Sequence, residues 1–232
     1  WTAYYLAQQA PGLRVAVLER EFAGFGASGR NGGWLTAELA GPPERYARDH
    51  GRDAVLRLQR AMFQAVDEVV AVAAREGIAA DIVKGGMLLV ARNRAQRARL
   101  HETLAHLRRW GWGEADLRVE PPDRRLRAAG AAAALWSPHC ARIQPARLVR
   151  GLARAVVARG VALYERTPVT EILPGRAVTP YGTVRARHVI RATEGFTAAL
   201  RGHRRTWLPL NSSMIVTEPL PEAVWERIGW AG

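Results

Sequence analysis

The chain has 232 residues, of which 48% are hydrophobic, so it can bury the core of one large or two small globular domains. No apolar run is long enough to span a bilayer, and 34 Lys and Arg against 21 Asp and Glu give a net charge of +13. The single cysteine, Cys140, excludes an internal disulfide and fits a reducing, cytoplasmic compartment.

The positive charge does not predict a nucleic-acid partner. Lys84 is the only lysine, and arginine and alanine are spread over the whole chain, which indicates a compositional bias. The densest basic cluster, Arg201 with His203–Arg205, has no interleaved aromatic residues on which bases would stack. We therefore expect a small-molecule substrate and no nucleic acid, and nothing in the sequence predicts the oligomeric state.

The first predicted elements are a helix over Trp1–Gln9, ended by Ala-Pro-Gly, and a short apolar strand over Val15–Leu18. The strand ends at a carboxylate, Glu19, and runs into glycine-rich chain. This order is typical of a dinucleotide-binding unit, in which the acid binds the ribose hydroxyls. We predict that Glu19 binds a ribose and that Arg20 covers the adenine side.

The glycine-rich segment ends at Trp34. Its small residues permit the close approach of backbone N–H groups to a large flat ligand. Gly32 and Gly33 are expected to open a helix whose positive end faces the ligand, Arg30 to offset phosphate charge, and Asn31 to bind the ligand or brace the loop. The predicted binding residues here are Ala27, Ser28, Gly29, Arg30, Asn31, Gly32, Gly33 and Trp34.

Farther along the chain, apolar residues at helical spacing predict core helices over Ala54–Ala74 and Ala95–Trp110, with a strand over Met87–Ala91 between them. Pro145 suits a first helical position, so a helix is expected over Ala146–Arg159. Further strands are predicted at Val161–Glu165, Thr170–Leu173, Ala177–Thr179, Thr183–Arg185, His188–Ala192 and Met214–Thr217, the third and fourth forming a hairpin.

No catalytic residue or metal site is predicted. His139 and Cys140 are adjacent, and neighbouring side chains on extended chain point to opposite faces, which disfavours a thiolate–imidazole pair. Spacings typical of metal ligands are also absent from the sequence.

The segment GASGRNGG after VLE resembles the D-amino-acid oxidase / glycine oxidase (DAO) superfamily of FAD-dependent oxidoreductases, and most of all its γ-glutamylputrescine oxidase branch. Three weaker segments are similar to the same family. They are Ile143–Ala153, Pro168–Thr170 and Ile190–Thr197, which resemble the return to the nucleotide domain, the strand that meets adenine, and the closing A-T-x-G segment.

The resemblance implies an α/β fold, with an incomplete Rossmann-like two-dinucleotide-type FAD-binding domain and an interleaved mixed α+β substrate domain. Residues 1–84 and 145–205 would form the FAD-binding domain, and residues 85–144 and 206–232 the substrate domain. The cofactor would be FAD, with Trp34 facing the isoalloxazine. The further contacts that the resemblance implies are Val169 through its backbone, Ala192, Thr193 and Gly195.

The implied reaction is removal of a hydride from the carbon next to the nitrogen of an amine or amino acid. The imine then hydrolyses, and oxygen or another acceptor takes the electrons. The family's G-x-G-x-x-G turn would precede Trp1, so we expect a fragment that binds FAD poorly alone and whose catalytic groups lie beyond Gly232.

Two alternatives remain at this point. A dehydrogenase with one NAD-binding unit would continue as alternating parallel strands and helices after the glycine-rich segment, whereas Val161–Ala192 predicts a meander. A flavoprotein module without catalysis would bind FAD but would not be reduced by amines.

Overall fold

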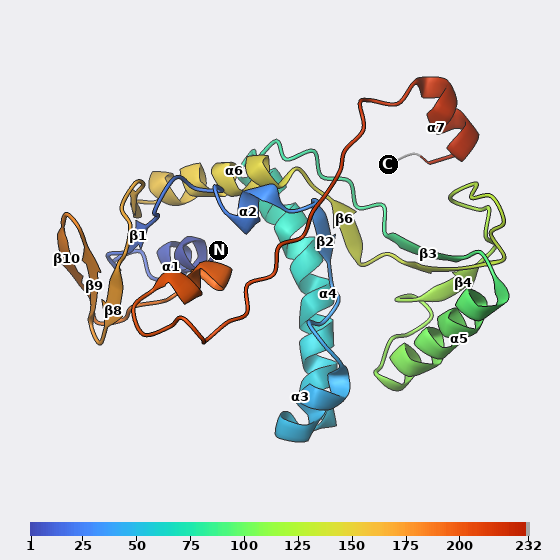
Figure 1. Cartoon of the computed structure of the whole chain (residues 1–232), viewed down its shortest axis with the longest axis horizontal. Coiled ribbons are helices and arrows are strands. Elements are labelled where there is room, and N and C mark those ends of the chain that lie inside the picture. The colour runs from blue at the N-terminus through green and yellow to red at the C-terminus, as the bar shows by residue number, and fades with distance from the viewer. Residues whose placement is uncertain (231–232) are drawn as a thin grey trace. The chain divides into compact units, whose positions relative to one another are not determined.

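The computed structural model describes residues 1–230, and its contacts divide the chain into two compact units, each made of two segments (Figure 1). Unit 1 comprises Trp1–Gly32 and Pro145–Ile215, and unit 2 comprises Gly33–Gln144 and Val216–Gly232. The first change of unit therefore lies at Gly32–Gly33, whereas the sequence-based boundary was at residue 84.

Unit 1 contains a parallel strand pair flanked by two helices. Strand β1 (Ala16–Leu18) pairs in parallel with β7 (Ala162–Tyr164), with Ala16 opposite Ala162. Helix α1 (Thr2–Gln9) contacts α6 (Pro145–Ala158), which runs directly into β7. The helices predicted over Trp1–Gln9 and Ala146–Arg159 are confirmed. The parallel pairing of β1 with β7 is a finding of the structure, and parallel strands need a long crossover between them.

A three-stranded antiparallel meander follows in the same unit. Strands β8 (Glu171–Leu173), β9 (Arg176–Thr179) and β10 (Gly182–Arg185) lie side by side in the order β10-β9-β8 (Figure 1). Gly175, at φ +71°, makes the first turn in a conformation that favours glycine. The predicted hairpin is confirmed, and the meander differs from the strand–helix alternation of a single NAD-binding unit.

In unit 2, β2 (Trp34–Thr36) pairs antiparallel with β6 (Cys140–Arg142) beside the helices α3 (Pro43–His50) and α4 (Arg52–Arg75). The buried Gln59 amide of α4 donates to the Ala37 carbonyl at 2.9 Å. This bond joins α4 to the chain after β2, and Ala80 and Val83 also hydrogen-bond to Gln144 and Arg142, so residues 33–84 are tied to the rest of unit 2.

The rest of unit 2 is a three-stranded antiparallel sheet covered by one helix. The sheet has the order β3-β5-β4, from β3 (Met87–Ala91), β5 (Ala133–Ser137) and β4 (Arg118–Glu120). Helix α5 (Arg94–Arg109) packs on it through the core residues Leu100, Leu104, Leu107, Phe63, Trp112, Leu117 and Leu135. Helix α7 (Glu222–Ile228) ends the described part of this unit.

Two predicted strands are wrong. His188–Ala192 and Met214–Thr217 lie outside every helix and strand of residues 1–230 and pair with no strand there. Ile190 is 62% exposed, and Ile215 is fully exposed. Apolar residues alone do not make a strand. A segment without a neighbouring strand gains no inter-strand hydrogen bonds and no cross-strand side-chain contacts.

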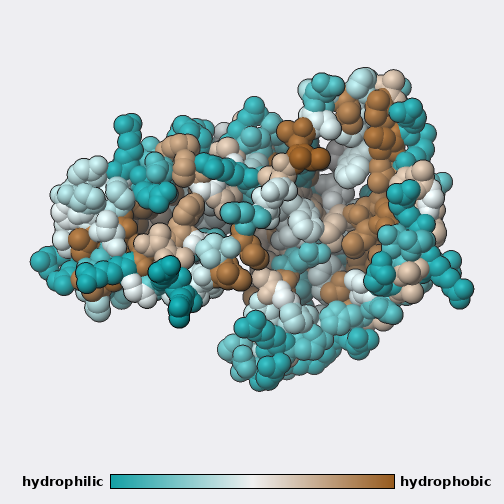
Figure 2. All heavy atoms as spheres, in the orientation of Figure 1, coloured by the Kyte–Doolittle hydropathy of each residue, from teal (hydrophilic) through white to brown (hydrophobic). Residues whose placement is uncertain are grey.

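The face of the molecule in Figure 2 is mostly hydrophilic, with hydrophobic residues gathered in several separate patches. Among the described residues, no helix has the length and apolar character needed to cross a bilayer.

Candidate functional site

Glu19 follows directly after β1, where the parallel pair ends. Its backbone N–H donates to the Tyr164 carbonyl at 2.9 Å, and its carbonyl accepts from the Thr167 N–H at 2.8 Å. One carboxylate oxygen accepts from the Glu21 N–H at 2.9 Å. The side chain is thus fixed by backbone, and its second oxygen has no hydrogen-bond partner in the described part of the chain.

Arg20 connects this strand end to a second predicted segment. Its guanidinium lies 5.5 Å from the centre of the Phe196 ring, in the 3₁₀ helix η1 (Glu194–Ala199), and 3.3 Å from the Glu21 carboxylate. The structure therefore brings Glu19 and Arg20 close to the segment of Ala192, Thr193 and Gly195.

The backbone of that segment is accessible. A methyl group placed on Gly195 would meet no atom within 4 Å, and Ala192 is exposed. The Thr193 hydroxyl lies 2.7 Å from that of Thr197, which fixes the start of η1.

Val169 lies in the connection between β7 and β8, half-buried and outside any strand. The strand predicted to contain Val169 begins only at Glu171. The first backbone hydrogen bond from this connection to β9 is that of the Thr170 N–H to the Val178 carbonyl, at 2.9 Å. Thr167, two residues before Val169, is bonded to Glu19, so this connection starts beside the acid.

The glycine-rich segment packs tightly within unit 1. A Cβ on Gly29 would lie 2.0 Å from the Gly24 carbonyl oxygen, and one on Gly24 would lie 2.5 Å from Val149 of α6. Helix α2 (Ala27–Arg30), which contains Gly29, contacts α6. These two glycines are therefore required by packing of the protein on itself.

Asn31 braces this segment, which was one of its two expected roles. Its amide nitrogen donates to the carbonyls of Ala27 and Ser28, both at 3.1 Å. The Arg30 guanidinium lies 4.4 Å from the centre of the Phe25 ring, and Arg30 is exposed. Ala27 and Ser28 are exposed as well.

The helix expected after Gly32 and Gly33 is absent, because strand β2 begins at Trp34. Gly33 is buried at φ +73°, a conformation that favours glycine, and its carbonyl accepts from the Ile143 N–H at 2.8 Å. Trp34 is 57% exposed. Gly33 and Trp34 belong to unit 2, whereas the other predicted residues of this segment, Ala27 to Gly32, belong to unit 1.

The residues of unit 1 fit a dinucleotide. Glu19 presents a half-buried carboxylate with one uncommitted oxygen at the end of a parallel strand, which is what a ribose diol requires. The open backbone at Gly195 offers room beside it. Among the described residues, no group of three His, Cys, Asp or Glu is placed to hold a metal ion.

A contact that sequence reasoning missed joins His139 to Asp116 in unit 2, with Nε2 and Oδ1 2.8 Å apart. The His139 ring is stacked on Phe63, with centres 3.7 Å apart and planes 11° apart. Cys140 is buried, and this burial raises the pKa of its thiol. No local pattern joins residues 23 positions apart, so no signal in the sequence marked this pair.

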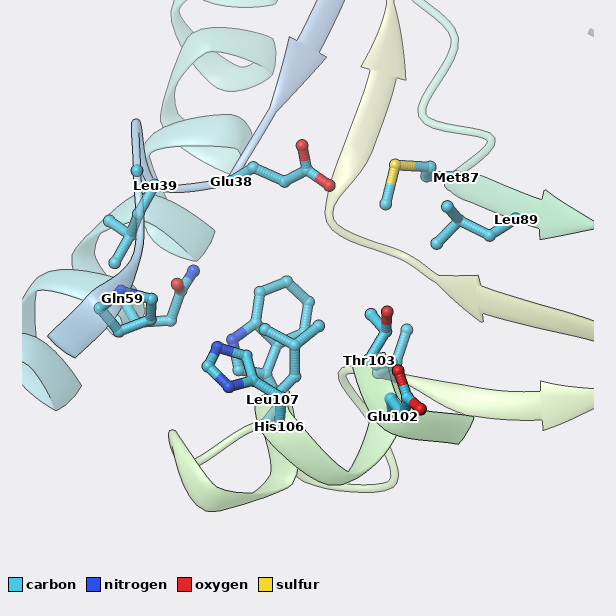
Figure 3. A pocket seen from close by; sticks show the side chains of 13 residues that line it. Glu38, Leu39, Gln59, Met87, Leu89, Glu102, Thr103, His106 and Leu107 are labelled. Atoms are coloured by element: carbon cyan, nitrogen blue, oxygen red, sulfur yellow. The ribbon is translucent and has the colours of Figure 1, made fainter. Parts of the chain in front are cut away.

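A cavity of about 450 Å³ also lies within unit 2. Apolar and polar side chains from the β2–α3 connection, α4, β3 and α5 surround it (Figure 3). The lining residues are Glu38, Leu39, Gly41, Pro43, Gln59, Met87, Leu89, Glu102, Thr103, His106, Leu107, Trp112 and Leu117.

Known proteins match almost the entire chain. Residues 1–231 match the family model of the DAO FAD-dependent oxidoreductases. γ-Glutamylputrescine oxidoreductase of Escherichia coli is 31% identical over 227 residues, which cover 95% of this chain and 53% of that protein. The probable oxidoreductase OrdL of Haemophilus influenzae is 25% identical over 232 residues, with 94% and 53% covered.

Solved structures show the same fold. Glycine oxidase from Bacillus cereus superimposes with a TM-score of 0.65 at 20% identity, covering 85% of this chain and 54% of that one. L-Proline dehydrogenase from P. horikoshii gives 0.66 at 18% identity, covering 87% and 51%. The chain spans about half the length of the curated relatives that it matches. The α/β class expected from the sequence is confirmed by these structures and by the family match. The chain belongs to the DAO family of FAD-dependent oxidoreductases.

Proposed function

We propose that the protein containing this chain oxidises the C–N bond of a small amine or amino acid with FAD. The observation that carries the proposal is the Glu19 carboxylate, fixed at the end of a parallel strand in a chain of the DAO family. The names of two similar proteins support the substrate class, because γ-glutamylputrescine and glycine both contain an amino group.

In this proposal most of the residues assigned to the cofactor belong to unit 1, Gly33 and Trp34 are the exceptions, and the rest of unit 2 belongs to the substrate domain. Glu19 accepts hydrogen bonds from the ribose hydroxyls, and Arg20, the Val169 backbone and the Ala192, Thr193 and Gly195 segment surround the adenosine half. We assign the glycine-rich segment to the pyrophosphate and the flavin. The residues of this assignment are Ala27, Ser28, Gly29, Arg30, Asn31, Gly32, Gly33 and Trp34.

When bound, FAD supplies the hydride acceptor. The oxidised substrate is an imine, which water hydrolyses, and oxygen or another acceptor takes the electrons. We also propose a cytoplasmic location, which the single buried Cys140 supports, because a free thiol is typical of a reducing compartment.

The test is a visible absorption spectrum of the protein from its complete reading frame, followed by anaerobic addition of a panel of amines and amino acids. We expect flavin bands that one of these compounds bleaches. Flavin bands that no amine bleaches would favour a different donor or a non-catalytic flavoprotein module. A protein that is purified without flavin and does not bind added FAD would contradict this proposal and would favour the alternative of an NAD-dependent dehydrogenase.

A further inference from the structure

The cavity of unit 2 has a largely apolar wall. Leu39, Met87, Leu89, Leu107 and Leu117 line it from the β2–α3 connection, β3, α5 and the chain before β4. Its volume of about 450 Å³ is within the range of small-ligand sites. A ligand for this space would carry a hydrocarbon part, because the burial of apolar surface is the main gain that such a wall offers.

Trp112 adds an unpaired hydrogen-bond donor to this wall. The residue lines the cavity, and only 5% of it is exposed. Its Nε1 is buried and has no hydrogen-bond partner in the part of the chain that the structure describes. An indole N–H donates and cannot accept, and a buried donor without a partner is costly. This donor therefore favours a ligand that brings an acceptor.

The neighbours of Trp112 within the core are aromatic rings. Phe63 meets its ring edge to face, with centres 4.8 Å apart, and the His139 ring lies 6.3 Å away at 84°. The other buried side-chain atom without a partner within residues 1–230 is His139 Nδ1, but His139 does not line the cavity. Among the described residues that line the cavity, Trp112 is therefore the one whose buried polar atom still needs a partner.

The carboxylates of the lining carry their charge in solvent. Glu38, from the β2–α3 connection, and Glu102, from α5, are exposed and lie on different sides of the cavity (Figure 3). Solvated carboxylates gain little from a cation, whereas both would repel an anion that enters between them. An uncharged ligand avoids this repulsion and loses no hydration of a charged group.

We propose that this cavity binds an uncharged ligand with a hydrocarbon body and a carbonyl oxygen that accepts a hydrogen bond from Trp112 Nε1. A carbonyl oxygen accepts and brings no donor, so it pairs the indole without adding a second unpaired group. An ammonium group only donates and would leave Nε1 without a partner. The proposal rests on unit 2 alone and assigns the cavity to no step of the proposed oxidation.

The test uses the whole protein, with ¹⁵N in its eight indole rings and ¹³C in its methionine methyl groups, titrated with 2-heptanone and followed by NMR. Trp112→Phe and Met87→Leu assign the two reporter signals. We expect the Trp112 indole proton to move downfield and the Met87 methyl to shift, while Met62 and Met214, which do not line the cavity, stay unchanged. We expect 2-aminoheptane, with the same carbon skeleton, to bind about fivefold or more weakly.

The hydrogen bond is tested with Trp112→Phe, which keeps an aromatic wall and removes the donor. We expect this variant to lose the preference for the ketone over the amine, while Trp225→Phe, at an exposed site in α7, keeps it. If Trp112→Phe does not fold, the Met87 signal of the wild type still compares the two ligands.

The proposal fails if either reporter stays unchanged with millimolar 2-heptanone, if ketone and amine bind equally, or if folded Trp112→Phe keeps the preference. Bleaching of flavin by amines is read separately, so this result and that of the proposed function can differ.

Discussion

His139 Nε2 lies 2.8 Å from Asp116 Oδ1, and the second oxygen of Asp116 accepts from the Gly113 N–H at 2.7 Å. One carboxylate thus joins the turn after α5 to the chain that enters β6. We expect Asp116→Ala to lower the free energy of unfolding by about 1–3 kcal/mol, because it leaves two donors without their partner. Chemical denaturation measures the change, and Asp123→Ala, at an exposed site, is the control. Equal stability of the two variants would contradict a structural role for Asp116.

Glu120 is a buried carboxylate held between two arginines. Arg125 donates to both of its oxygens, and Arg118 donates to one at 3.0 Å. Both guanidiniums also cover the ring of Trp136, at 4.2 and 3.9 Å. The bond from Arg125 is the largest influence that lowers the pKa of Glu120 below its ordinary value of 4.5.

Because the folded-state pKa is lowered, this group stabilises the fold above its unfolded-state pKa and loses that effect as the pH falls through the folded-state pKa. We expect Glu120→Gln to be less stable than the wild type by about 1–3 kcal/mol at pH 7. The difference should shrink as the pH falls below 4.5. Urea denaturation between pH 3 and about pH 7 checks this, and a difference independent of pH would be inconsistent with it.

Gly29 tests the tight packing of the glycine-rich segment. An added Cβ would lie 2.0 Å from a backbone oxygen, which no side-chain movement can relieve. We expect Gly29→Ala to lower stability by about 1–3 kcal/mol and to reduce the FAD content of the purified protein. Gly12→Ala, where the added methyl group meets nothing within 4 Å, is the matched control. If both variants melt at the wild-type temperature, the packing role assigned to Gly29 is wrong.

Glu19 tests the cofactor assignment. We expect Glu19→Ala to weaken FAD binding by about 10-fold to 100-fold, since it removes hydrogen bonds from a charged acceptor to the ribose. Calorimetric titration of the flavin-free protein with FAD measures the affinity. Glu226→Gln, an exposed acid in α7, serves as the control. Unchanged affinity in a folded Glu19→Ala protein would remove Glu19 from the site.

The sequence alone determined most local structure and the family. The strand over Met87–Ala91, the helix opened by Pro145 and the hairpin around Gly182 depend on periodicity, proline and glycine, which act within a few residues. The segment from Glu19 to Gly33 carried the resemblance to the DAO family for a similar reason, because its spacing is readable along the chain.

Features that depend on contacts between residues far apart in the sequence became visible only in the tertiary structure. His188–Ala192 and Met214–Thr217 have the composition of strands but form none, since pairing is a property of two segments. The division at Gly32–Gly33, the His139–Asp116 contact and the cavity between α5 and β3 also required the fold. Each arises from residues far apart in sequence, whereas sequence patterns report only the preferences of neighbours.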